Sequence, residues 1–148
     1  MSAVLRLATL DQRHFQLHPT VLQQLLDYID GLDALCKTLG VTALSEFVDI
    51  TALEFSDASQ LVSPAAESAP KVDPETGLAW SIEDMDWFPA SNGMITLEAL
   101  IAHLQRNRPR EVSGANRVQL LAALAFCEQQ LGPLEAEGGQ FHLAATHE

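Results

Sequence analysis

The amino-acid sequence predicts an α+β fold that is mainly α-helical, with three principal amphipathic helices and short terminal strands that form a small antiparallel sheet or hairpin. Two observations predict this fold. Three segments repeat apolar residues at intervals of three and four, and a segment near the C-terminal end alternates apolar and polar residues. The chain has 148 residues, 47% of them apolar, which is enough for one domain spanning residues 1–148.

The first helix is expected over about residues 19–39. Pro19 is compatible with a helix start, and Gly40 can adopt the left-handed conformation that often ends a helix. Gly31 lies in the middle and costs about 1 kcal/mol relative to Ala, so we expect either a bend or a closely approaching backbone there. The apolar stripe consists of Leu22, Leu25, Ile29, Leu32, Cys36 and Leu39.

Two further helices are expected over about residues 96–107 and 116–131. Thr96 is the expected N-cap of the first of them, and Pro109 follows its end. The second is expected to stop at Gly132-Pro133, because proline removes a backbone donor and glycine favours a helix end. Both segments carry a stripe of leucines, and the second is apolar enough to be central.

The residues near the two ends of the sequence are expected to be strands. Residues 140–146 alternate weakly with period two after Gly138-Gly139. Residues 4–7 are similarly apolar and are the nearest candidate partner, since a single strand leaves its backbone groups unpaired.

A long acidic region rich in Pro, Ser and Ala extends over about residues 56–93. A loop of this length without structure is unusual in a compact domain, so we expect an anchoring turn. Ser81 can cap such a turn over residues 81–84, whose acidic residues suit the positive end of a helix dipole.

The charge balance is strongly acidic, with 20 Asp and Glu residues against 8 Lys and Arg, a formal net charge of −12. Such a surface repels phosphates and anionic headgroups, so neither a nucleic-acid partner nor a membrane partner is expected. No secretory signal or membrane-spanning stretch is evident in the sequence. Cys36 and Cys127 lie on apolar stripes, as free thiols of a cytoplasmic protein do, with a disulfide between them as the alternative.

The basic residues are concentrated late in the sequence, where residues 93–117 are net positive. The simplest interpretation is that these side chains cap a helix end and pair with the acidic half of the molecule. The four residues concerned are Arg106, Arg108, Arg110 and Arg117.

No motif in the sequence defines a catalytic chemistry. GxSxG, P-loop, GxGxxG and CxxC patterns are all absent, so no catalytic residue, metal ligand or cofactor is assigned. His14 and His18 have i, i+4 spacing but lack the further ligands of a zinc site. The cluster of Glu83, Asp84 and Asp86 lacks the glycine turn of a calcium-binding loop.

One segment has the composition of a protein interface, because large apolar side chains alternate there with carboxylates. The alternative is that both tryptophans fold back to cover the helices and anchor the long loop. The residues assigned to partner binding are Trp80, Glu83, Asp84, Met85, Asp86, Trp87 and Phe88.

Together these features favour a small, acidic, non-catalytic protein-binding module of bacterial type in the cytoplasm. Its expected partner is a basic protein, which it would neutralise as an inhibitor or immunity-like protein. One alternative is an adaptor or structural subunit that self-associates into a homo-oligomer through leucine-rich helix faces. Another is a metal-dependent hydrolase that uses His and carboxylate residues.

Overall fold

The computed structural model describes residues 3–54, 73–78 and 80–147. A five-stranded sheet has the order β2-β1-β5-β3, and β4 also pairs with β5. Its pairs are antiparallel except that β3 runs parallel to β5. The strands are β1 (Ala3–Asp11), β2 (His14–Val21), β3 (Val48–Asp49), β4 (Phe88–Pro89) and β5 (Gln140–His147).

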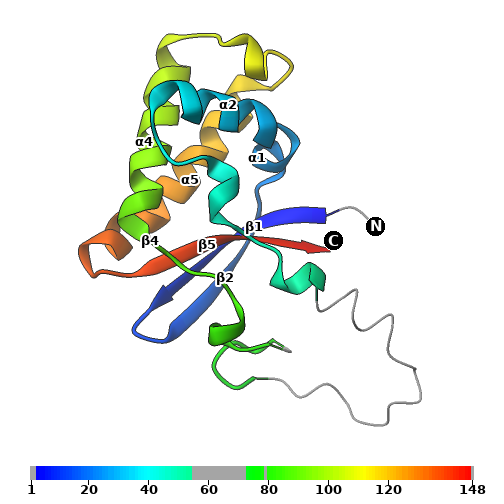
Figure 1. The fold of residues 1–148 in the computed structure, drawn as a ribbon, viewed down its shortest axis with the longest axis vertical. Helices are drawn as coiled ribbons and strands as arrows, with labels where there is room; N and C mark the ends of the chain where they lie inside the picture. Colours follow the sequence, from blue (N-terminus) through cyan, green and yellow to red (C-terminus); the bar gives the residue numbers. More distant parts are fainter. Residues whose placement is uncertain (1–2, 55–72, 79, 148) are drawn as a thin grey trace.

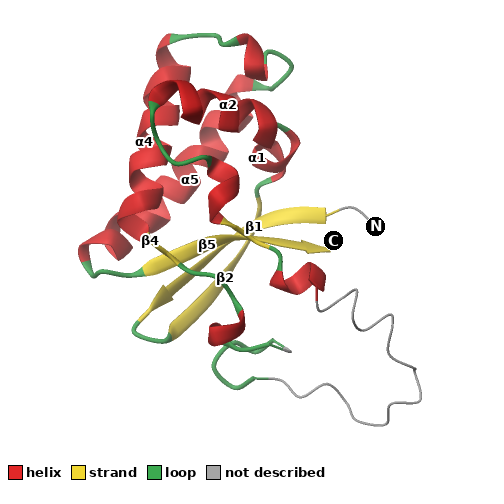
Figure 2. Cartoon of the chain, in the orientation of Figure 1, coloured by secondary structure: helices red, strands yellow, loops and turns green. Residues whose placement is uncertain are grey.

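Helices cover one face of this sheet, as Figures 1 and 2 show. The fold is therefore mixed α and β and largely helical, which confirms the coarse prediction. Within the described residues, the α-helices include α1 (Gln23–Asp27), α2 (Ile29–Leu39), α4 (Ala90–Arg106) and α5 (Arg117–Ala136), and the short 3-10 helices are η1 (Leu44–Phe47), η2 (Ile82–Asp84) and η3 (Arg110–Val112).

The predicted pairing of the first and last strands is confirmed. β1 pairs with β5 from Ala3 to Leu10, with Val4 opposite Thr146 and Leu7 opposite Leu143. The period-two pattern is real as well, because Phe141 and Leu143 join the core under the helices while His142 lies on the opposite face of the sheet.

The start of the first predicted helix was wrong, because residues 14–21 form the edge strand β2. The β1–β2 turn has Gln12 and Arg13 at positive φ (49° and 68°), and the chain then returns alongside β1. An edge strand tolerates Pro19, since its missing N–H is needed by no neighbouring strand on the open side. The apolar stripe of residues 22–39 is retained but is divided between α1 and α2 at Tyr28.

The boundaries of the other two predicted helices also differ from the structure. α4 begins at Ala90, and Thr96 is buried within it, where its hydroxyl donates a hydrogen bond to the Thr42 carbonyl (2.8 Å). α5 begins as predicted, with the Asn116 side chain accepting from the Gln119 N–H, but it continues through Pro133 to Ala136.

Two predictions about glycines are confirmed. Gly40 caps α2 in the left-handed conformation, with φ of 74°. A Cβ at Gly31 would collide with the backbone carbonyl oxygen of Glu111, so η3 packs directly against α2 at this point. The glycine therefore permits a close backbone approach.

The core lies between the sheet and the helices. Leu5, Leu100 and Leu124 are completely buried there. Cys36 and Cys127 are buried and free, so the alternative of a disulfide between them was wrong. Among the described residues, no helix combines the length and hydropathy needed to cross a bilayer.

The second face of the sheet is buried too, although α1, α2, α4 and α5 all lie on the opposite side of the sheet. Val4, Ala8, His142 and Ala144 are each at most 6% exposed. The described part of the long loop passes beneath this face in Figure 1, where Leu78, Trp80 and Met85 line a small cavity together with His142 and Ala144 of β5. The residues predicted to bind a partner, residues 80–88, belong to this part of the loop.

Candidate functional site

Residues 80–88, called the covering segment below, combine buried apolar side chains with exposed carboxylates. Met85 and Ile82 are 6% and 4% exposed, whereas Trp80, Trp87 and Phe88 are half-buried. The three carboxylates predicted to face a partner are all exposed. They are Glu83, Asp84 and Asp86.

Trp87 anchors the covering segment to the sheet. Its ring lies 4.3 Å from that of His142 and 5.9 Å from that of Phe15, measured between centroids. The indole N–H donates a hydrogen bond to the Ile82 carbonyl (2.9 Å). Phe88 packs edge-on against Phe47 at 5.5 Å. The tryptophans thus anchor the loop, as the alternative interpretation of the sequence proposed, but they pack against the sheet face of His142 and not against the helices.

The predicted turn at Ser81 exists and is a capping box. The Asp84 carboxylate accepts hydrogen bonds from the Ser81 backbone N–H (2.9 Å) and hydroxyl (3.1 Å). The Asp84 N–H in turn donates to the Ser81 carbonyl (3.1 Å). This turn holds the short helix η2 and fixes the direction in which Glu83 leaves the backbone.

A buried carboxylate, Asp49, fastens the covering segment from the inside. Asp49 is 4% exposed and follows Val48 at the end of β3. It accepts hydrogen bonds from the Thr51 hydroxyl (2.8 Å), the Thr51 N–H (3.2 Å) and the Asp86 N–H (3.0 Å). These three hydrogen bonds offset the unfavourable free energy of burying the carboxylate.

His142 lies beside Asp49 and is 1% exposed. Its Nε2 is 3.8 Å from an Asp49 carboxylate oxygen, which is too long for a hydrogen bond, and neither ring nitrogen has a partner of normal geometry among the described residues. Burial lowers the pKa of His142 to about 4, although the Asp49 carboxylate opposes this shift. The imidazole is therefore neutral at pH 7.

A small cavity of about 10 Å³ adjoins His142 and Asp49. It is about the size of one water molecule and is otherwise lined mainly by apolar side chains, including Phe15, Leu17 and Met85. A histidine next to a carboxylate can act as a base, but a cavity this small admits no substrate. Both residues contact the covering segment: Asp49 accepts a hydrogen bond from the Asp86 N–H, and His142 packs against Trp87.

Arg13, at the tip of the β1–β2 hairpin, holds the covering segment from the outside. Its guanidinium donates to both Glu75 oxygens (2.6 and 2.8 Å) and to Glu83 (2.7 Å). These bonds lower the pKa of Glu75 and raise that of Arg13. The arginine thus neutralises part of the acidic surface and joins two segments far apart in the sequence.

The predicted histidine pair occupies one face of β2. His18 is 8% exposed, contacts the Thr9 hydroxyl (3.2 Å) and packs against Phe126, and burial lowers its pKa. His14 is exposed and lines a groove with Asp11 and Glu137, where a hydrogen bond with Asp11 raises the pKa of Glu137. Within the described ranges, no three His, Cys, Asp or Glu side chains are placed to hold a metal ion.

Sequence reasoning missed Asp49 and the environment of His142. The alternation of residues 141–145 already placed His142 opposite Phe141 and Leu143, which was the available signal. No comparable signal marks Asp49, since it depends on a donor 37 residues away at Asp86.

Comparison of the chain with protein-family models, with curated proteins and with solved structures finds no match in any of the three. The fold and the site therefore define the chain only as a mixed α/β protein with an acidic, aromatic-anchored segment, and the function is argued from that chemistry.

Proposed function

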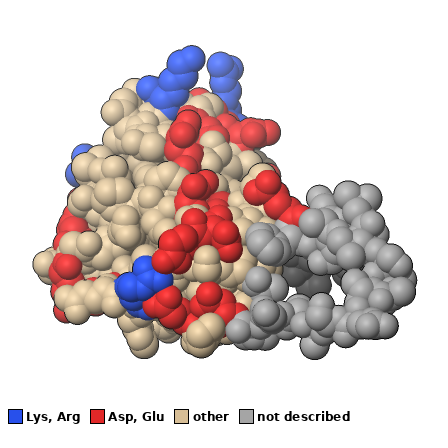
Figure 3. All heavy atoms as spheres, turned by 60° about the horizontal axis from the view of Figure 1, so that its bottom comes forward, with Lys and Arg blue, Asp and Glu red and all other residues tan. Residues whose placement is uncertain are grey.

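We propose that the protein is a small acidic protein-binding module that docks onto a basic protein through the covering segment. The observation that carries this proposal is that exposed Glu83, Asp84 and Asp86 extend from a backbone fastened on both sides. Figure 3 shows acidic side chains gathered over the face that includes this segment, with most basic side chains near its upper margin.

The rigidity of the covering segment matters for binding. Asp49, the capping box and Arg13 hold its backbone before a partner arrives, so little conformational entropy is lost on association. The half-buried rings of Trp80, Trp87 and Phe88 offer apolar area next to the carboxylates. Aromatic anchors surrounded by charge are typical of binding hot spots.

The experiment compares capture of lysate proteins by two double variants. Glu83→Gln/Asp86→Asn removes two exposed charges from the covering segment and leaves the Asp86 N–H in place for Asp49. Glu98→Gln/Glu135→Gln removes two exposed charges from the helices. Proteins retained at low and at raised salt are identified by mass spectrometry.

The expected result is one basic protein that the wild type and the helix variant retain at low salt and the segment variant loses. Equal retention by the two variants would show that overall charge, and not this segment, recognises the partner. Loss of the unfolding transition in the segment variant alone would assign the two carboxylates to stability.

Self-association is a second candidate, and one observation favours it. A groove of about 360 Å³ between the end of β2, α1 and α5 is lined without any Asp, Glu, Lys or Arg side chain. Val21 and Val118 are 44% and 78% exposed, and Val21 lines this groove. Sedimentation over a concentration series, with Val21→Ser as the variant, tests whether copies associate at this groove.

A further inference from the structure

The basic end of the molecule contains a second site, distinct from the covering segment. Arg106, Arg108, Arg110 and Arg117 are four of the eight Lys and Arg residues, and all lie within twelve positions around the connection between α4 and α5. Among the described residues, none of the four forms an ion pair with a carboxylate. The predicted pairing with the acidic half of the molecule is therefore not seen in this part of the chain.

One of these arginines is fixed by the fold. The Arg117 side chain donates hydrogen bonds through Nε and Nη2 to the Leu104 carbonyl, near the C-terminus of α4. The predicted capping of a helix end by an arginine is thus confirmed. Both bonds use the edge of the guanidinium that carries Nε and Nη2. The other nitrogen, Nη1, has no partner within the described residues.

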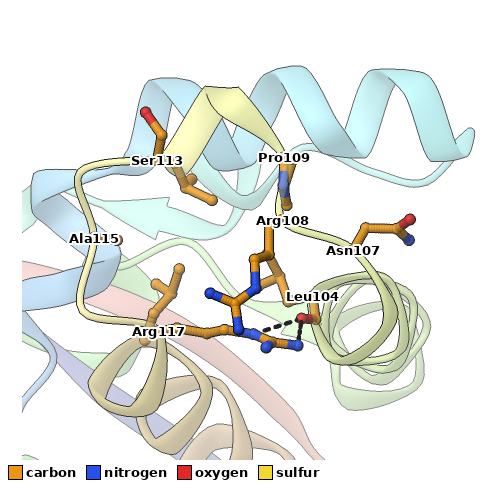
Figure 4. Close-up of a pocket in the computed structure, with 9 residues that line it drawn as sticks. Leu104, Asn107, Arg108, Pro109, Ser113, Ala115 and Arg117 are labelled. Atoms are coloured by element: carbon orange, nitrogen blue, oxygen red, sulfur yellow. Dashed lines mark hydrogen bonds between the residues drawn. The ribbon is translucent and has the colours of Figure 1, made fainter.

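The second arginine, Arg108, is exposed and lines the same pocket as Arg117. In Figure 4 the two side chains extend into the space between the end of α4 and the start of α5. The pocket has a volume of about 160 Å³, and its remaining walls include Val112, Ala115 and Leu120. This volume is comparable to that of an apolar cavity that binds benzene, roughly 150 Å³.

We propose that this pocket binds a small organic anion. The carboxylate or phosphate group lies against the guanidiniums of Arg108 and Arg117, and a compact apolar body of about the size of a benzene ring contacts Val112 and Leu120. Guanidinium groups suit this role, because their planar donors match the oxygens of both anions. On a protein of net charge −12, two guanidiniums that have no carboxylate partner among the described residues give an anion a local site within a repulsive surface.

The test is a titration of the ¹⁵N-labelled protein, followed by backbone amide shifts, with four probes: benzoate, phenyl phosphate, inorganic phosphate and benzyl alcohol. We expect benzoate or phenyl phosphate to cause saturable shifts at Ser113, Ala115 and Arg117. Benzyl alcohol should bind at least about tenfold more weakly, since it lacks the charge-assisted hydrogen bonds. Tighter binding of phenyl phosphate identifies a phosphate monoester as the ligand class, and tighter binding of benzoate identifies a carboxylate.

Three variants localise the binding. Arg108→Gln should weaken it about tenfold or more, whereas Arg110→Gln, with the same charge change outside the pocket lining, should leave it within about twofold. Ala115→Leu should block binding by filling the pocket without a change in charge. Equal losses in the Arg108 and Arg110 variants, equal binding of benzyl alcohol, or no saturation up to about 20 mM of any probe would each overturn the proposal.

Discussion

The neutral, buried imidazole of His142 makes stability depend on pH. The pKa of His142 is about 4 in the folded protein, whereas an unburied histidine has a pKa of 6.5. In the unfolded chain His142 therefore binds a proton as the pH falls below 6.5, whereas in the folded chain it stays neutral down to about pH 4. The free energy of unfolding thus decreases as the pH falls from 6.5 to about 4. We expect His142 to contribute a loss on the order of 3 kcal/mol in the free energy of unfolding between pH 7 and pH 4.

Urea unfolding of His142→Leu across the same pH range measures this contribution. At pH 7 the variant should keep its free energy of unfolding within about 1 kcal/mol, because neither imidazole nitrogen has a hydrogen bond of normal geometry among the described residues. At pH 4 it should be the more stable protein. Parallel pH profiles for wild type and variant would assign the acid sensitivity to other groups, such as His18.

The two cysteines are expected to be unreactive in the folded protein. Burial raises the pKa of Cys127 to about 12 and also raises that of Cys36. Because the thiolate is the reactive form, a thiol reagent at pH 8 should modify neither residue until denaturant is added. Counting modified thiols by mass spectrometry, with and without guanidinium chloride, checks this. Rapid labelling of either cysteine without denaturant would contradict it.

At the level of elements, two helical glycines form a matched pair. A Cβ at Gly31 would collide with the backbone of Glu111, whereas a Cβ at Gly132 would meet nothing within 4 Å. Gly31→Ala should therefore destabilise the protein by about 1 to 3 kcal/mol, while Gly132→Ala should stabilise it by up to about 1 kcal/mol. Thermal or urea unfolding of both variants measures these changes in stability. Equal changes in the two variants would show that η3 does not pack tightly against α2 at Gly31.

Elements whose own residues determine their environment were predictable from the sequence. The stripe of residues 22–39 shows which side of the helices faces the core, and the alternation of residues 140–146 shows which face of the strand meets the helices; both elements form. β2 was not predictable in this way, because its apolar residues are few and its pairing comes from β1 and the turn at Gln12-Arg13. The end of α5 was not predictable either, because the helix continues through Pro133 to Ala136. Gln129, whose carbonyl would bond an N–H at Pro133, is exposed and can bond to water.

The candidate site was predictable only on its outer surface. The alternation of aromatic and acidic residues marked residues 80–88, and the structure places the carboxylates outside and Met85 inside. The support beneath, from Asp49 and His142, joins three segments distant in the sequence, and local patterns do not reveal such contacts. The partner of this surface stays a prediction.

At the level of the whole molecule, the net charge of −12 should make stability depend on salt. Carboxylates on one face repel one another, and counter-ions weaken that repulsion over a distance of about 10 Å at 0.1 M salt. The melting temperature should rise by roughly a few degrees when NaCl is raised from about 20 to about 200 mM. Glu83→Gln/Asp86→Asn should show a smaller rise. A melting temperature that falls with salt would mean that ion pairs such as Arg13–Glu75 dominate over net repulsion.

The pairing of β1 with β5 also governs how the molecule can be assembled during synthesis. β1 leaves the ribosome long before β5, its neighbour towards the middle of the sheet, which starts at Gln140. At a translation rate of about 5 to 20 residues per second, β5 is synthesised on the order of 10 s after the β1–β2 hairpin, and only then can β1 pair with it. Until then, Leu5 and Leu7 lack their strand partners, so the nascent hairpin offers an apolar, open edge to chaperones.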